Sequence, residues 1–232
     1  MNLFLEAVHW ILDPANWTGA GGISQRMLEH IGFSFSVLLA AAVIGIPIGA
    51  MIGHTGRGRA LIIATTSGAR ALPTLGLLTL LGLGLGIGLE APFLALLVLA
   101  LPPVLAGAYA GIESVDRATI GAARAIGLTE RQILTGVELP LGAPVIIGGL
   151  RSAALQVIST ATLAAYISDT GLGRILFLGI KTQRYDMMLA ASILVALLAL
   201  VVELLFQIVQ SAASRRAEPH RAQAPASERI TA

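Results

Sequence analysis

The sequence predicts an all-α protein that crosses a membrane about five times, and composition, hydropathy and segment length predict it. The chain is 56% hydrophobic and 12% charged, whereas soluble domains average about 25% charged residues. Its mean hydropathy is +0.83. The apolar residues gather in segments of about 20 residues or more, which is the length that a helix needs to cross a hydrocarbon core. These segments must be helical, because lipid offers no partner to an unpaired backbone group.

Composition and charge also exclude several classes of function. The net charge is only +2 and the basic residues form no dense face, so no nucleic-acid partner is expected. Cysteine is absent, which leaves neither a disulfide framework nor a thiolate metal site. The histidines lie far apart without ligand spacing, and we expect no metal and no cofactor. They are His9, His30, His54 and His220.

The expected spans follow one another along most of the chain, and together they form a transmembrane domain over residues 31–210. Their ranges are 32–53, 60–88, 91–112, 144–166 and 187–209. The second span is expected to be interrupted near Arg70 and Pro73, because proline removes a helical hydrogen bond.

The two ends of the chain differ from the spans. Residues 1–30 carry Glu6 and no basic leader, so they are predicted to be an interfacial segment outside the membrane and not a cleaved signal peptide. Trp10 and Trp17 would lie at headgroup depth. Residues 211–232 are rich in Ala, Pro, Arg and Glu and are predicted to form a disordered cytoplasmic tail.

The basic residues predict the orientation, because cytoplasmic segments carry an excess of Arg and Lys. An amino terminus outside and a carboxyl terminus inside would place on the cytoplasmic side Arg57, Arg59, Arg117, Arg124, Arg131, Arg215, Arg216, Arg221 and Arg229. The outside would hold only Arg26, Arg174, Lys181 and Arg184. This excess favours that orientation.

The longest polar stretch between spans covers residues 113–140. Asp116–Ala125 is predicted to form a short helix, since it is rich in alanine. Gly127 would end it, and Thr129 can cap a second short helix. Pro140 ends that helix or bends it into the fourth span. We therefore predict a compact elbow of two helices on the cytoplasmic side.

The spacing within this stretch is informative. Gly121-Ala122-Ala123 is followed after three residues by Gly127, and after nine more by Val137-Glu138-Leu139-Pro140. This pattern resembles the EAA loop of binding-protein-dependent ABC importer permeases, with Gly121 in place of the usual glutamate. The resemblance extends from His30 to about residue 209. It implies a type I ABC importer permease fold in a bacterial inner membrane.

The resemblance also implies how the chain would work. The loop would be a coupling helix that docks on ABC ATPase subunits, through Gly121, Ala122, Ala123, Gly127, Leu128, Leu139 and Pro140. The sequence has no Walker loop, so ATP hydrolysis would lie on another chain, and this one is not expected to be an enzyme or to hold catalytic residues. An extracytoplasmic substrate-binding protein and a second permease are the other implied partners, beside membrane lipid. The second permease makes either a homodimer or a heterodimer, and the missing glutamate favours the heterodimer.

In more detail, the chain resembles permeases for osmoprotectants such as glycine betaine, choline and carnitine. The passages that carry this resemblance are Ile46–Gly49, Ala71–Leu75, Leu101–Gly107 and Thr170–Gly173. Permeases for methionine and other amino acids share much of this organisation and remain the alternative. A quaternary ammonium is typically held in an aromatic cage, which is expected on the separate binding protein because only 5% of this chain is aromatic.

Polar residues within spans are candidates for the translocation path. They are Arg70, Pro73, Gln156, Ser159 and Thr160. A charge within a bilayer is costly and usually faces a cavity, although Arg70 could instead pair with a carbonyl that the proline frees. The polar residues of the fourth span could face a hydrated pore or bind a neighbouring helix. Arg151 and Glu203 are close enough to span ends to snorkel.

Two other classes of protein fit less well. A gradient-driven secondary transporter predicts inverted repeats and an acidic residue at the midplane, and the sequence shows neither. An intramembrane enzyme needs His, Asp or Ser groups that converge within spans. His54 and Asp169 lie at span ends with no partner visible in the sequence.

Overall fold

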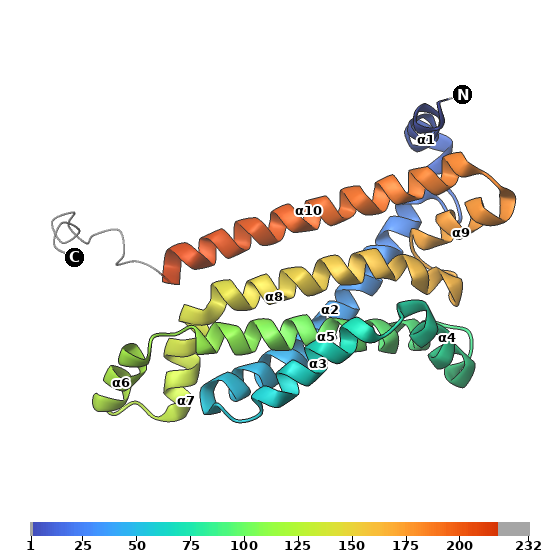
Figure 1. Cartoon of the computed structure of the whole chain (residues 1–232). Helices are drawn as coiled ribbons and strands as arrows, with labels where there is room; N and C mark the ends of the chain where they lie inside the picture. The colour runs from blue at the N-terminus through green and yellow to red at the C-terminus, as the bar shows by residue number, and fades with distance from the viewer. Residues whose placement is uncertain (1, 218–232) are drawn as a thin grey trace.

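The computed structural model describes residues 2–217, without the side chains of Leu61, Ile63, Thr65, Ala69 and Arg70. The described residues form helices and turns and no strand, which confirms the predicted fold class. The long helices are α2 (Ile23–Thr55), α5 (Glu90–Glu113), α8 (Leu139–Thr160) and α10 (Tyr185–Ala217). With the helical turns that flank α8, these are the 4 candidate membrane spans. α2 packs on α5, α5 on α8 and α8 on α10, and α2 also crosses and contacts α8 (Figure 1).

The expected second span is two shorter helices, α3 (Arg59–Ala71) and α4 (Thr74–Leu85). The predicted interruption is confirmed, because Pro73 is extended with φ −71° and ψ 114° and separates the helices. Each half alone, at 13 and 12 residues, is shorter than the roughly 20 residues that a span needs, so neither is among the 4 candidate membrane spans. Both helices pack on α5.

Glycines allow the long helices to approach closely. A Cβ on Gly49 of α2 would lie 2.6 Å from the carbonyl oxygen of Leu105 in α5. Gly45 and Gly53 meet α5 one turn before and after, as their four-residue spacing predicts. The core of the bundle fills the space between α2, α5 and α8 with Val37, Ala41, Leu96, Ala100, Val104, Ala153, Val157 and Ala161.

The contact between α5 and α8 is closer still. A Cβ on Gly142 would lie 2.5 Å from the carbonyl oxygen of Gly111, and a Cβ on Gly107 would lie 2.6 Å from the Cα of Gly149. Any side chain at these positions would push the helices apart. The two spans that flank the polar elbow are therefore held backbone against backbone.

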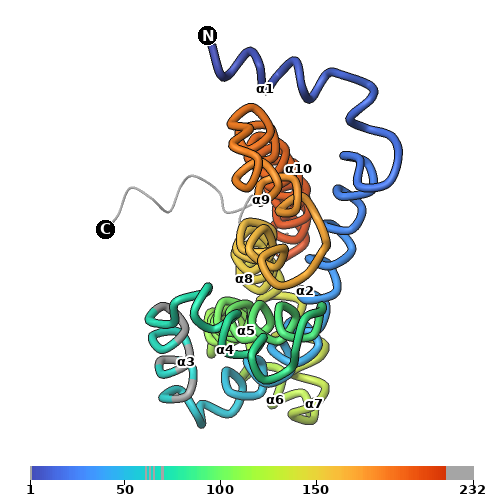
Figure 2. The backbone as a smooth tube through the Cα atoms, turned by 90° about the vertical axis from the view of Figure 1, so that its right-hand side faces the viewer, coloured from blue at the N-terminus to red at the C-terminus, as the bar shows by residue number. Residues whose placement is uncertain are grey.

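The ends of the bundle carry the short helices. α6 (Arg117–Ala125) and α7 (Glu130–Ile133) lie at the end where α10 terminates (Figure 1). The opposite end carries α1 (Leu3–Leu12), the 3-10 turn Pro14–Asn16 and α9 (Gly173–Thr182). Figure 2 shows that α1 lies across the direction of the spans.

Part of the predicted disordered tail is helical. Residues 211–217 continue α10 without a break, so the prediction of disorder is wrong for them. The remainder, 218–232, lies outside the described residues.

Candidate functional site

The elbow consists of two capped helices, as the sequence predicts. The carboxylate of Asp116 accepts a hydrogen bond of 3.1 Å from the backbone N–H of Ala118 at the start of α6. Gly127 ends the helix with a φ of +88°, a left-handed conformation that glycine adopts without strain. Thr129 and Gln132 then form a reciprocal capping box at the start of α7.

The elbow passes into α8 without a loop. A single π-helical stretch, Leu134–Glu138, joins α7 to α8. Pro140 lies in the first turn of α8, directly after the π-helical stretch. The chain changes direction between α7 and α8 (Figure 1), as the predicted bend at Pro140 requires. The second helix is shorter than predicted because the π-helical stretch replaces its last turn. No loop separates α7 from the membrane span α8.

A small apolar core makes the elbow rigid. Its buried members are Val115, Ile120, Ala123 and Ile133, and Leu128 and Val137 pack against them. Ala123 and Leu128, which the family pattern singles out, thus face inward and hold α6 on α7. Their place in this core is observed, whereas a docking role for the loop remains a prediction.

Between the exposed Arg117 and Arg124, the outer surface of α6 is small and apolar. Gly121 and Ala122 are exposed, and a Cβ on Gly121 would meet nothing within 4 Å. Ile126 projects from the end of the helix with 80% of its surface exposed. Sequence reasoning missed Ile126, although a large apolar residue just before a helix-ending glycine is a signal for an exposed tip. This surface is suited to contact with another protein chain.

A buried carboxylate connects the elbow to α2. Nδ1 of His54, at the end of α2, donates to Oε2 of Glu138 at 2.5 Å, and Glu138 is only 2% exposed. On the other side of the ring, Nε2 lies 3.2 Å from Oε2 of Glu130. Glu130 in turn accepts two hydrogen bonds from Arg124, at 2.8 and 3.0 Å. The hydrogen bonds to Glu130 raise the pKa of the Arg124 guanidinium above its ordinary value.

We call His54, Glu138, Glu130 and Arg124 the strut. It links α2, the π-helical stretch, α7 and α6 through side-chain contacts. The expectation that His54 lacks a partner is wrong, because the partner lies 84 residues away in the sequence.

The candidate path residues do not converge on one site. Gln156, Ser159 and Thr160 lie on α8, whereas Pro73 lies between α3 and α4, which pack on α5. The side chain of Arg70 lies outside the described part of the chain. Ser159 and Thr160 donate to carbonyls of their own helix, those of Leu155 and Gln156.

One stripe of α8 is left uncovered by the rest of the chain. Ser152 and Ser159 are exposed, and Gln156 is partly exposed between them. They share one face, since residues three and four apart are neighbours on a helix. The stripe is polar in the half of α8 that lies away from the elbow.

An ion pair joins α8 to α10 within the spans. Nε of Arg151 donates to Oε2 of Glu203 at 2.6 Å, and a second nitrogen of the guanidinium pairs with the other carboxylate oxygen. Gln210 accepts from Arg151 and donates to the carbonyl of Pro144. Arg151 and Glu203 were expected to snorkel; the structure pairs them instead, which satisfies both charges inside the bundle.

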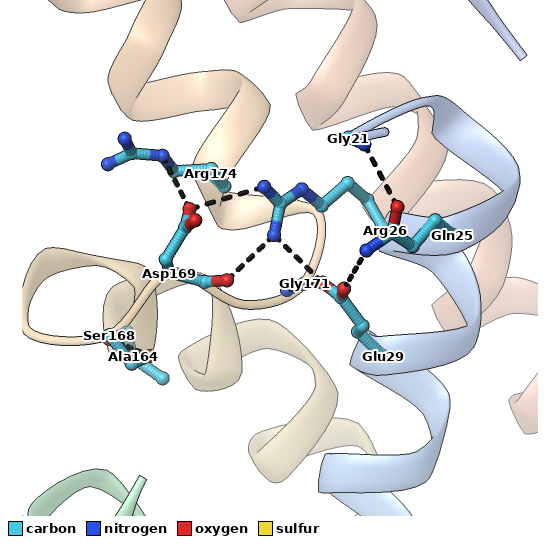
Figure 3. A network of polar contacts seen from close by, with 9 residues as sticks. All are labelled: Gly21, Gln25, Arg26, Glu29, Ala164, Ser168, Asp169, Gly171 and Arg174. Atoms are coloured by element: carbon cyan, nitrogen blue, oxygen red, sulfur yellow. Dashed lines mark hydrogen bonds and ion pairs between the residues drawn. The ribbon is translucent and has the colours of Figure 1, made fainter. Parts of the chain in front are cut away.

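A second polar network lies at the α1 end, between α2 and the turn after the fourth span (Figure 3). Arg26 donates to the backbone oxygen of Asp169 at 2.7 Å and to its carboxylate at 3.2 Å, and Arg174 also pairs with that carboxylate. Glu29 accepts from Arg26 and from the N–H of Gly171. Asp169 therefore has partners, contrary to the expectation from the sequence, and the network fixes the turn on α2.

Comparison with known proteins decides the family. Residues 45–218 match the model of the binding-protein-dependent transport system inner membrane component family. The chain belongs to this family. It is a permease subunit of an ABC importer located in the inner membrane, and such subunits work with separate ATPase and substrate-binding partners.

Several relatives resemble the permease over most of its length. The carnitine transport permease protein OpuCB of Listeria monocytogenes is 34% identical over 75% of this chain and 80% of its own. The glycine betaine/carnitine/choline transport system permease protein OpuCD of Bacillus subtilis is 32% identical over 84% and 85%. The osmoprotectant import permease protein OsmW of Salmonella typhimurium is 29% identical over 89% and 96%.

Solved structures agree on the fold. An inward-facing structure of the MetNI methionine ABC transporter superposes with a TM-score of 0.72 and 20% identity, covering 83% of this permease and 96% of that chain. At this identity the likeness shows the type I permease fold alone.

Proposed function

We propose that this permease imports quaternary-ammonium osmoprotectants of the glycine betaine, choline and carnitine type. The observation that carries the substrate class is that relatives 28 to 34% identical, across most of both chains, are named for these solutes. The polar stripe on α8 supports it, because a small zwitterion or cation needs hydroxyl and amide groups without a strong counter-charge. Ser152, Gln156 and Ser159 supply such groups.

The stripe would become a path only between two permeases. Polar side chains that face lipid are disfavoured, so a second permease, either another copy or a different subunit, would cover this face of α8. Two such stripes facing each other would line a hydrated passage.

Coupling to ATP would occur at the elbow. The exposed surface of Gly121, Ala122 and Ile126 would dock on the partner ATPase, while the inner core keeps the elbow rigid. Leu139 and Pro140 are the first residues of α8, the span that follows α7, so they would transmit the movement of the elbow to this span and would not bind the ATPase. The strut would carry the same movement into α2.

The elbow must lie in the cytoplasm to meet an ATPase. The arginines near the elbow and at the end of α10 support this orientation, since α6, α7 and the end of α10 lie at one end of the bundle (Figure 1). The amino terminus would then lie outside with α1.

The test is uptake into proteoliposomes that contain the permease, its ATPase and its binding protein. ATP-dependent accumulation of radiolabelled glycine betaine, choline or carnitine is the expected result, with no accumulation when ATP is replaced by a non-hydrolysable analogue. Uptake of methionine, with no uptake of the three osmoprotectants, would show that the permease transports amino acids instead. Uptake driven by a sodium or proton gradient without ATP would contradict the proposal entirely.

A further inference from the structure

An apolar groove lies between α2, α8 and α10, away from the residues of the proposed path. Its volume is about 380 Å³, within the range of roughly 300–1,000 Å³ typical of ligand sites. Its walls include Phe35 and Leu38 of α2, Ala154 and Ile158 of α8, and Val201 and Phe206 of α10. Such walls suit a hydrocarbon chain.

One polar atom interrupts these apolar walls. Ser34 lines the groove and is only 5% exposed. Among the described residues, its Oγ is the buried side-chain polar atom that has no hydrogen-bond partner. A buried hydroxyl without a partner is unfavourable, and nearly all such groups in folded proteins are satisfied. The described residues leave this hydroxyl unpaired, and a molecule seated in the groove would supply its partner.

The groove faces away from the polar stripe of α8. Successive residues of a helix are rotated by about 100°, so Ala154, on the groove side, points about 200° away from Ser152 on the stripe. The outer face of α10 outside the groove is apolar too, and Leu197 and Leu200 are exposed there. If the stripe faces a second permease, the groove faces the bilayer.

The depth of Ser34 indicates which part of a lipid would reach it. The charged network of Arg26, Glu29 and Asp169 marks the polar layer at the α1 end. Ser34 follows Glu29 by five residues, or about 7–8 Å along α2. The polar zone on each side of a bilayer is roughly 5–8 Å thick, so Ser34 lies at its inner border. Ester carbonyls that join acyl chains to glycerol occupy this level.

We propose that the groove is a binding site for one glycerophospholipid of the leaflet on the α1 side. One acyl chain lies along Leu38, Ile158 and Phe206, and the Ser34 hydroxyl donates to the ester carbonyl of that chain. The hydroxyl gains its partner, and the apolar walls are covered by hydrocarbon. This site is separate from the proposed solute path and does not depend on the solute.

Binding is tested by native mass spectrometry of the detergent-extracted transporter with its partner chains, delipidated and titrated with diacyl phosphatidylglycerol or phosphatidylethanolamine. One saturable phospholipid for each copy of this permease is expected. Val201→Trp fills the groove and should lower occupancy at least tenfold. The control Leu200→Trp lies on the same helix outside the groove and should leave it unchanged; Leu200 and Val201 are 57% and 54% exposed.

The hydrogen bond is tested with an ether-linked phospholipid that lacks the carbonyls. In the unmodified permease the ether lipid should bind about three- to tenfold more weakly than the ester lipid. Ser34→Ala should weaken the ester lipid by a similar factor and bind both lipids equally, since the two changes remove the same interaction.

Three results would overturn the proposal. If Val201→Trp binds as much lipid as the control Leu200→Trp, the lipid lies elsewhere. Equal binding of ether and ester lipids by the unmodified permease would remove the role of Ser34. A disulfide between two copies carrying Val201→Cys, formed in membranes before extraction, would show that protein and not lipid covers the groove.

Discussion

Removal of His54 should detach the elbow from α2. In His54→Ala, the carboxylate of Glu138, which is 2% exposed in the unmodified permease, loses the ring nitrogen at 2.5 Å. Loss of a hydrogen bond to a buried charged group costs about 1.5–3 kcal/mol. Since 1.4 kcal/mol is a factor of ten, the attached state of the elbow should become less favourable by about 10–10²-fold.

Milder changes at the same place should have smaller effects. Glu138→Gln keeps a neutral hydrogen bond to His54 and should cost about 1–2 kcal/mol. Glu113→Gln is the control, because Glu113 and Arg59 form an exposed pair 3.9 Å apart at the same end of the bundle. Surface pairs contribute about 0–1 kcal/mol, so this variant should behave like the unmodified permease.

The assay combines two measurements on the reconstituted transporter. Hydrogen exchange should become faster in residues 117–138 of His54→Ala by about one to two orders of magnitude, the ratio expected from the lost hydrogen bond. The amount of solute moved per ATP should fall, because the ATPase would move an elbow that no longer carries α2. The double variant His54→Leu/Glu138→Leu should recover protection, since replacing both partners removes the stranded charge. Unchanged exchange and an unchanged transport ratio in His54→Ala would refute the role of the strut.

Three further predictions concern the elbow, the ion pair and the polar stripe. A Cβ at position 127 would meet nothing within 4 Å, but the backbone there has a φ of +88°, so Gly127→Leu should cost about 1–2 kcal/mol through backbone strain. In pull-down assays this variant should lose the ATPase, whereas the control Gly136→Leu should retain it. Arg151→Met should lower the thermal unfolding temperature of the extracted permease, and adding Glu203→Leu should restore most of it; additive losses would mean that the pair is not coupled. Gln156→Leu should reduce solute uptake several-fold while ATPase binding stays intact, and normal uptake would remove this residue from the path.

Features set by neighbouring residues could be predicted from the sequence. The elbow helices depend on Asp116, Gly127 and Thr129, each of which acts on backbone groups within three residues or on its own backbone. The glycine face of α2 was predictable in the same way, because four-residue spacing places Gly45, Gly49 and Gly53 on one side of a helix.

Contacts between distant segments could not be predicted. Arg151 and Glu203 are 52 residues apart, and Arg26 and Asp169 are 143 apart. Their pairing depends on which helix faces which, and a single sequence does not encode this locally. Opposite charges isolated in two apolar runs were a usable signal for Arg151 and Glu203, since a charge in lipid requires a partner. The break at Pro73 was visible, whereas the lengths of the resulting helices were set by the packing of α3 and α4 on α5.

The most direct test of the central claim is site-specific crosslinking from the tip of the elbow. The chain has no cysteine, so Ile126→Cys carries its sole thiol, which can be labelled with a photoreactive maleimide in the assembled transporter. Leu12→Cys, at the opposite end on α1, is the control; Ile126 and Leu12 are 80% and 70% exposed. The account predicts a crosslink from position 126 to the ATPase subunit and none to it from position 12. A crosslink from position 12 to the ATPase would contradict the account. So would the absence of a crosslink from position 126 in a complex that hydrolyses ATP.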